Sequence, residues 1–140
     1  MSKSEMFKKA HQMTREVKAQ FPKVNYRVQF GLSLAYLHNV EEEAKMVELK
    51  GTVKQVKWAE KIRERFVAES KKRFEMKMNL YKKMNKPELI EKHTNIYNFM
   101  MEKVNNENRS VWFIEIIGNS DRDYNYIFDN LARLEKQARL

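Results

Sequence analysis

The first twenty residues show hydrophobic positions spaced three or four apart, which is the spacing of side chains on one face of a helix. These positions are Met6, Ala10, Met13 and Val17. Ser2 and Glu5 have the spacing of a capping box, which marks a helix start. Pro22 disfavours a helical conformation at the residue before it, Phe21. The pattern therefore predicts a first helix that ends near Phe21.

The next segment, residues 24–34, fits two structures. Its apolar residues alternate as in a strand: Val24, Tyr26, Val28, Phe30, Leu32 and Leu34. Read as a helix capped by Asn25, the same residues form two apolar faces, and Gly31 permits close approach by a neighbour. A strand needs partners, and the other candidate is the β-branched segment 110–117. We favour helix for both segments, with a small sheet of the two as the alternative.

A second capping box, Thr52 with Gln55, opens the longest predicted helix. Neither Gly nor Pro occurs again before Pro87, so this helix is expected over residues 52–84, with a length of roughly 50 Å unless it bends near Ser70.

Two more helices are predicted after Pro87. The first directs inward Leu89, Ile90, His93, Ile96, Tyr97, Met100 and Val104. A polar loop at residues 105–108 follows it, and the last helix is expected to start at Ser120, with Asp123 completing its cap.

Together these elements predict a mainly all-α fold, a compact bundle of about five or six helices with one long basic helix. Three Gly and two Pro are too few for a sandwich or barrel with many turns. We expect a helical N-terminal module at residues 1–47, and a second part at residues 48–140 that packs as one domain.

Charge changes this picture, because it is concentrated in the predicted long helix. Residues 49–86 carry 13 Lys or Arg and 4 Glu, whereas the rest of the chain is almost neutral, and the whole chain has a net charge of +9. A localised positive field attracts phosphate backbones, anionic membranes or acidic protein surfaces.

The helical arrangement aligns part of this charge. At 100° per residue, five cations fall within an arc of about 80°. They are Lys54, Lys57, Lys61, Arg65 and Lys72. Trp58 lies at the margin of this arc, where its ring is placed to stack on a base while the cations pair with phosphates. The alternative is a solvated helix face whose Trp closes the edge of the core.

Arg63 falls on the apolar side of the same helix, where a guanidinium needs a carboxylate or several carbonyls. Glu115 is similarly isolated in the apolar segment 110–117 and is the expected partner in a structural ion pair. The alternative is that Arg63 extends out of a shallow groove.

Catalytic and metal chemistry have little support. His11, His38 and His93 lack metal-ligand spacing, and His11 and His93 are expected to make hydrogen bonds in packed surroundings. The acidic pair in 121–123 is better explained by helix capping than by a divalent metal. No Cys and no Gly-rich phosphate loop occur. The sequence thus predicts a non-enzymatic protein with no cofactor.

Two stretches resemble modules found in short proteins of phages and mobile elements of Gram-positive bacteria. The first is "MFKKAHQMTREVKAQFPKVNYRVQFGLSLAYL", and the second is "LKGTVKQVKWAEKIRERF" with the later "RSVWFIEI". Small proteins in that setting often inhibit host defences, including anti-CRISPR proteins that bind a Cas effector or its guide. The resemblance implies this role and supplies no catalytic residues.

Three functions follow from these observations. The first is a binder of nucleic acid or of a host nucleoprotein, which inhibits a defence system in the anti-CRISPR manner. The second is an accessory protein that binds single-stranded DNA during mobile-element replication. The third is an inhibitor that acts through protein contacts alone. We expect a cytoplasmic protein of a bacterial host cell without a membrane partner, because no apolar run is long enough to cross a membrane and residues 1–20 lack the apolar centre of a signal peptide.

Overall fold

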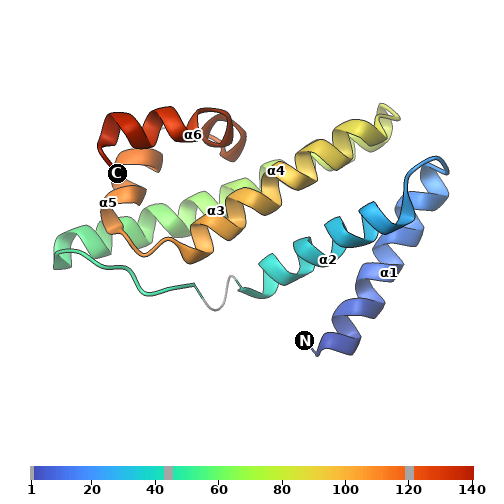
Figure 1. The fold of residues 1–140 in the computed structure, drawn as a ribbon, viewed down its shortest axis with the longest axis horizontal. Helices are drawn as coiled ribbons and strands as arrows, with labels where there is room; N and C mark the ends of the chain where they lie inside the picture. Colours follow the sequence, from blue (N-terminus) through green and yellow to red (C-terminus); the bar gives the residue numbers. More distant parts are fainter. Residues whose placement is uncertain (1, 43–45, 119–121) are drawn as a thin grey trace.

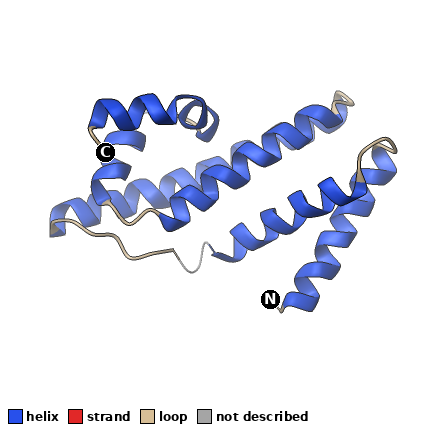
Figure 2. Ribbon diagram, in the orientation of Figure 1, coloured by secondary structure: helices blue, strands red, loops and turns tan. Residues whose placement is uncertain are grey.

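Helices form the regular structure of the computed structural model, which describes residues 2–42, 46–118 and 122–140. They are α1 (Lys3–Gln20), α2 (Tyr26–Glu42), α3 (Val53–Lys83), α4 (Pro87–Asn106), α5 (Ser110–Trp112), the π-helix η2 (Phe113–Ile117) and α6 (Tyr124–Ala138). The all-α prediction is confirmed (Figure 2). The alternative sheet does not form, because residues 26–34 and 110–117 are helical. In the described ranges, extended pairing is confined to one parallel bridge between Lys50 and Arg109.

Helices α1 and α2 begin at the caps that the sequence predicts. The backbone N–H of Glu5 donates to Ser2 Oγ at 3.2 Å, and the N–H of Ser2 donates to Glu5 Oε2 at 3.3 Å. Asn25 Oδ1 accepts from the Val28 N–H at 3.1 Å. The two helices pack through a small apolar cluster centred on buried Met6, Ala10 and Leu37.

Gly31 does not have the role that its position suggested. The prediction of close approach by a neighbour is wrong, because a Cβ atom at Gly31 would meet nothing within 4 Å. The buried side of α2 is formed instead by Leu32, Ser33 and Leu37. Gly31 lies on an exposed edge of α2.

Helix α3 is the longest element, at 31 residues, and its capping box is complete. The Gln55 N–H donates to Thr52 Oγ1 at 3.2 Å, and the Thr52 N–H donates to Gln55 Oε1 at 3.1 Å. The helix continues through Ser70 without interruption and ends before Asn85, whose positive φ of 56° turns the chain towards α4. The structure confirms the long helix to within one residue at each end.

Helix α4 returns alongside α3, and α6 packs across α4 (Figure 1). As predicted, Ile90, Ile96, Tyr97, Met100 and Val104 are buried, whereas Leu89 and His93 are half-buried. The main core lies among α3, α4, η2 and α6, and its largest fully buried side chains include Trp112, Tyr97, Tyr124 and Phe113.

The segment 110–117 is helical, as favoured, but most of it is a π-helix. Gly118, with a positive φ of 56°, ends this helix, and its N–H donates to Phe113 O at 2.8 Å. The wide turn directs Phe113, Ile116 and Ile117 into the core and leaves Glu115 exposed.

Two predicted boundaries were wrong. Asn105 belongs to α4 and is buried, as is Glu107, whose carboxylate accepts from Arg109 Nη2 at 2.6 Å. The polar loop predicted at residues 105–108 is therefore limited to residues 107 and 108. Helix α6 begins at Tyr124, because Asp123 is itself the N-cap and accepts from the Tyr126 N–H at 2.8 Å. The predicted cap Ser120 lies outside the described residues.

The N-terminal helices contact the rest of the molecule mainly through α2, which packs along α4, and Gln20 of α1 donates from Nε2 to Lys82 O at 3.3 Å. Tyr36 of α2 packs against both the small N-terminal cluster and the main core. The division into residues 1–47 and 48–140 stays a prediction.

Candidate nucleic-acid interface

One side of α3 presents the aligned cations to solvent. All five members of the predicted stripe, which we term the cationic face, are exposed: Lys54, Lys57, Lys61, Arg65 and Lys72. On the opposite side of the helix, Ala59, Ile62 and Phe66 are buried in the main core. The core contacts thus fix the rotation of α3 about its axis, and the cationic face points outward as a consequence.

Trp58 lies beside this face and is 47% exposed. Lys54 and Lys61 are four residues before it and three residues after it, so all three share one side of the helix. The second tryptophan, Trp112, is fully buried and donates from Nε1 to Glu135 Oε1 at 3.3 Å. About half of the surface of Trp58 is therefore open to solvent, whereas Trp112 belongs to the core.

The lysines of the cationic face differ from its arginine. Lys54, Lys57, Lys61 and Lys72 make no ion pair with any carboxylate of the described residues. Arg65 Nη2 donates to Gly118 O at 2.9 Å, which links α3 to the end of η2. A guanidinium has five N–H donors, so Arg65 retains donors for a phosphate while this contact holds it in place.

The predicted ion pair between Arg63 and Glu115 is wrong. Arg63 Nη1 donates to Val47 O at 2.7 Å, its guanidinium lies 5.9 Å from the centre of the Phe113 ring, and Glu115 is exposed. Burial lowers the pKa of Arg63, and the nearby carboxylates of Glu60 and Glu64 oppose this shift. A loop carbonyl, which sequence spacing does not reveal, takes the place of the expected carboxylate.

A shallow groove of about 780 Å³ runs along one edge of the cationic face. Lys57 and Lys61 line it together with Arg63, and Glu60 and Glu64 add carboxylates. Helical geometry places these two glutamates on one flank of the cationic face and Trp58 on the other. A phosphate chain on this surface would be repelled on the glutamate flank and attracted along the lysines towards Trp58.

Other charges on α3 are engaged by the fold. Arg73 and Lys77 reach the carboxylate of Asp123 at 3.6 Å and 3.9 Å, and Lys77 lies 4.7 Å from the centre of the Tyr124 ring. These cations join α3 to the start of α6. They are not included in the cationic face.

The three histidines are well separated. His11 Nδ1 is 2.8 Å from Tyr26 Oη, and its ring stacks on Phe30 at 4.3 Å, which confirms the predicted packing role. For His93 the predicted hydrogen bond is not made within the described residues, because its buried Nδ1 has no partner there. His38 is exposed. In the described ranges no three His, Cys, Asp or Glu side chains are grouped to hold a metal ion.

Sequence reasoning missed a second feature, a groove between α2 and α4 lined by several asparagines. Asn95, Asn98 and Asn105 recur at intervals of three and seven residues on α4, so they lie along one side of that helix. The spacing was available in the sequence. The burial of Asn98 and Asn105 depends on packing, which the sequence does not show.

Comparison with protein-family models, curated proteins and solved structures gave no match. Within the described ranges, no helix has the length and apolar character needed to cross a membrane. The fold and the site by themselves define an all-α protein, and the longest of its described helices exposes a row of cations beside a tryptophan.

Proposed function

We propose that this protein is a non-enzymatic binder of single-stranded nucleic acid and that the cationic face of α3 is its binding surface. The observation that carries the proposal is the alignment of Arg65 and four lysines on the solvent side of one helix, beside an exposed tryptophan; none of these lysines has an ion-pair partner among the described residues.

The cationic face suits a phosphate backbone. From Lys54 to Lys72 it extends over about 27 Å at 1.5 Å per residue. Because its lysines have no carboxylate partners among the described residues, phosphates would not have to displace an existing ion pair. Binding would release counterions, so affinity would fall steeply as the salt concentration rises.

Trp58 favours a single strand over a duplex. Bases in a duplex are stacked on one another, whereas a single strand offers their faces to aromatic side chains. The Trp58 ring is exposed next to the lysines, where a base can stack while its flanking phosphates meet Lys54 and Lys61.

The biological role rests on the resemblance to proteins of phages and mobile elements. We propose that the bound nucleic acid belongs to a host defence nucleoprotein of the Cas type, and that the protein inhibits this complex by occupying its nucleic acid. The replication accessory that binds single-stranded DNA would use the same face. Inhibition of a purified effector complex, compared with binding to free DNA and RNA, separates the two roles.

The binding surface can be tested with two variants of equal net charge. The first replaces Lys57, Lys61 and Lys72 by Glu, and leaves Arg65 in place because it contacts Gly118. The control replaces the exposed lysines Lys3, Lys8 and Lys9 of α1 by Glu. Fluorescence anisotropy with labelled single-stranded DNA and RNA measures affinity across a salt series, and circular dichroism checks the helical content.

We expect the α3 variant to lose binding and the α1 variant to keep most of it. Each lost phosphate contact removes about 0.7 from the slope of log K against log salt for a single strand. Replacing the same three lysines by Gln, which weakens binding without reversing charge, should therefore lower the slope by about 2. Equal losses in the α3 and α1 variants would show that net charge alone drives binding and would contradict the proposal.

A further inference from the structure

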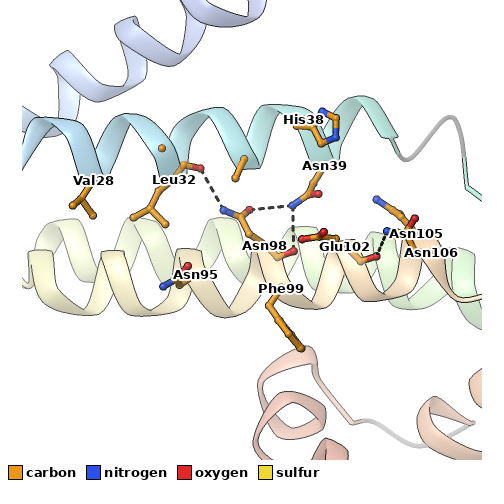
Figure 3. A pocket seen from close by; sticks show the side chains of 12 residues that line it. Val28, Leu32, His38, Asn39, Asn95, Asn98, Phe99, Glu102, Asn105 and Asn106 are labelled. Carbon is orange, nitrogen blue, oxygen red and sulfur yellow. Dashed lines mark hydrogen bonds between the residues drawn. The ribbon is translucent and has the colours of Figure 1, made fainter.

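A second groove, separate from the cationic face, runs between α2 and α4 and has a volume of about 610 Å³ (Figure 3). Its floor contains buried asparagines. Asn39 Nδ2 donates to Asn98 O at 3.2 Å, and Asn98 Nδ2 donates to Leu32 O at 3.3 Å. These bonds join α2 to α4 and fix the amide groups of Asn39 and Asn98.

Asn105 lies further along the same floor and differs from the other two. It is only 5% exposed, yet neither its Nδ2 nor its Oδ1 has a hydrogen-bond partner among the described residues. Its backbone carbonyl accepts from the Val47 N–H at 3.2 Å, which holds the residue in position. A buried amide without a partner is destabilising, so this side chain represents an unused donor and acceptor beside the groove, which a ligand reaches once the side chain turns towards it.

The groove differs chemically from the cationic face. Among its lining residues Glu102 is the one acidic side chain, and no Lys or Arg is present. Phosphates would find no Lys or Arg there and would be repelled by Glu102. The ligand should instead be neutral or basic and should contain groups that both donate and accept hydrogen bonds.

An extended polypeptide has this chemistry. Each residue of a strand carries one N–H and one C=O, and those that point to the same side repeat about every 6.6 Å. Groove positions on α4 that are four residues apart, such as Glu102 and Asn106, are separated by about 6 Å along the helix. From Asn95 to Asn106 the groove covers about 16 Å, the length of roughly five extended residues.

We propose that the α2–α4 groove binds an extended, neutral or basic segment of a partner protein, and that Asn105 pairs with its backbone amides. A polar floor is a poor match for the apolar face of an amphipathic helix, which is the other common peptide ligand of a groove between helices. The surface is independent of the cationic face, so it can fail its test without affecting the nucleic-acid proposal.

The binding test uses a pool of randomised hexapeptides, acetylated and amidated at their ends, titrated into ¹⁵N-labelled full-length protein. We expect the side-chain amide signals of Asn105 and Asn95 to shift. A second pool, N-methylated at alternate backbone amides, retains the side chains and loses backbone donors. It should cause no shift, because the contacts are made to the backbone.

The variant Asn105→Leu separates a binding role from a structural one. It removes the unpaired polar atoms with little change in shape, so thermal unfolding should occur at the same temperature or higher. Peptide affinity should fall at least tenfold. Asn130→Leu on α6, which lies outside the groove, is the matched control and should bind peptide as the parent does.

Three results would overturn the proposal. One is that both peptide pools leave the Asn105 signals unchanged. Another is that the N-methylated pool binds as well as the first, since the backbone would then not be recognised. The third is a shift caused by adenosine and not by peptides, because an asparagine amide also reads an adenine edge and the groove would then be a nucleobase site.

Discussion

The two sides of α3 show how one helix can separate stability from binding. The inner side contributes Ala59, Ile62 and Phe66 to the main core, each no more than 4% exposed. The outer side carries the cationic face and the exposed Trp58. The inner side determines how the helix is oriented, and on the outer side Arg65 is the member of the cationic face that also bonds to the fold, through Gly118 O.

The charged residues of α3 divide by residue type and not by side. Three arginines contact the fold: Arg63 through Val47, Arg65 through Gly118 and Arg73 through Asp123. The lysines of the cationic face make no comparable contact with described residues. A planar guanidinium with several donors can bond a carbonyl and still reach solvent, whereas a flexible lysine loses more conformational freedom per bond formed. Charge alone therefore does not identify which cations are available to a ligand.

The largest effect on stability is expected when an aromatic residue on the inner side is truncated. Phe66→Ala should lower the free energy of unfolding by about 3–5 kcal/mol, because it removes a side chain from a packed core and leaves a cavity. Trp58→Ala is the matched change on the outer side and should cost less than Phe66→Ala, because Trp58 is 47% exposed. Urea denaturation measures both. Similar losses in the two variants would contradict the division between the sides.

A smaller loss of stability is expected when Arg63 is replaced, because this residue lies between the two sides of α3. Arg63→Met should cost about 1–2 kcal/mol, because the Val47 carbonyl loses its guanidinium donor. Glu115→Gln should leave stability unchanged, since Glu115 is exposed and unpaired with Arg63. If denaturation of Glu115→Gln gave the same loss as Arg63→Met, the ion pair expected from the sequence would exist in solution.

The stability of the packing between α3 and α4 should also depend on pH. His93 of α4 lies in this packing, with its ring 5.1 Å from that of Tyr81 on α3. Burial lowers the pKa of His93, and Lys77 and Lys92 lower it further, while Asp129 and Asp123 oppose them. The unfolded state therefore takes up a proton more readily than the folded state. Stability should be highest above the unfolded pKa of about 6.5, and it should fall as the pH decreases through that value towards the folded pKa.

Thermal unfolding between about pH 7.5 and about pH 5.5 tests this prediction. The melting temperature of His93→Gln should fall less over that interval than that of the parent. His38→Gln, which alters an exposed histidine, serves as the control and should follow the parent. If the melting temperatures of the parent and of His93→Gln fell equally with pH, His93 would not be the cause of the loss of stability at low pH.

Local features of the fold could be predicted from the sequence, and features that depend on distant backbone could not. The bounds of α3 follow from Thr52 and Gln55, which bond each other within one turn. The partner of Arg63 was missed because a carbonyl acceptor such as that of Val47 is present at every residue and has no sequence signature. The π-helical turn at 113–117 and the burial of Asn105 likewise depend on the packing of other elements.

The candidate site shows the same limit. Helical periodicity placed Lys54, Lys57, Lys61 and Lys72 together, and their exposure in the structure agrees with that arrangement. Periodicity could not distinguish these lysines from Arg65, which is anchored to Gly118 through the tertiary fold. Their role in binding stays a prediction.

The most direct test of nucleic-acid binding by α3 uses the fluorescence of Trp58. Trp112 is fully buried, so a change in emission on addition of oligothymidylate reports mainly on Trp58. We predict saturable quenching that is reversed by salt and is absent in Trp58→Phe, whose remaining tryptophan is Trp112. Unchanged emission at oligonucleotide concentrations that saturate binding by anisotropy would place the strand elsewhere on the protein and contradict the proposed interface.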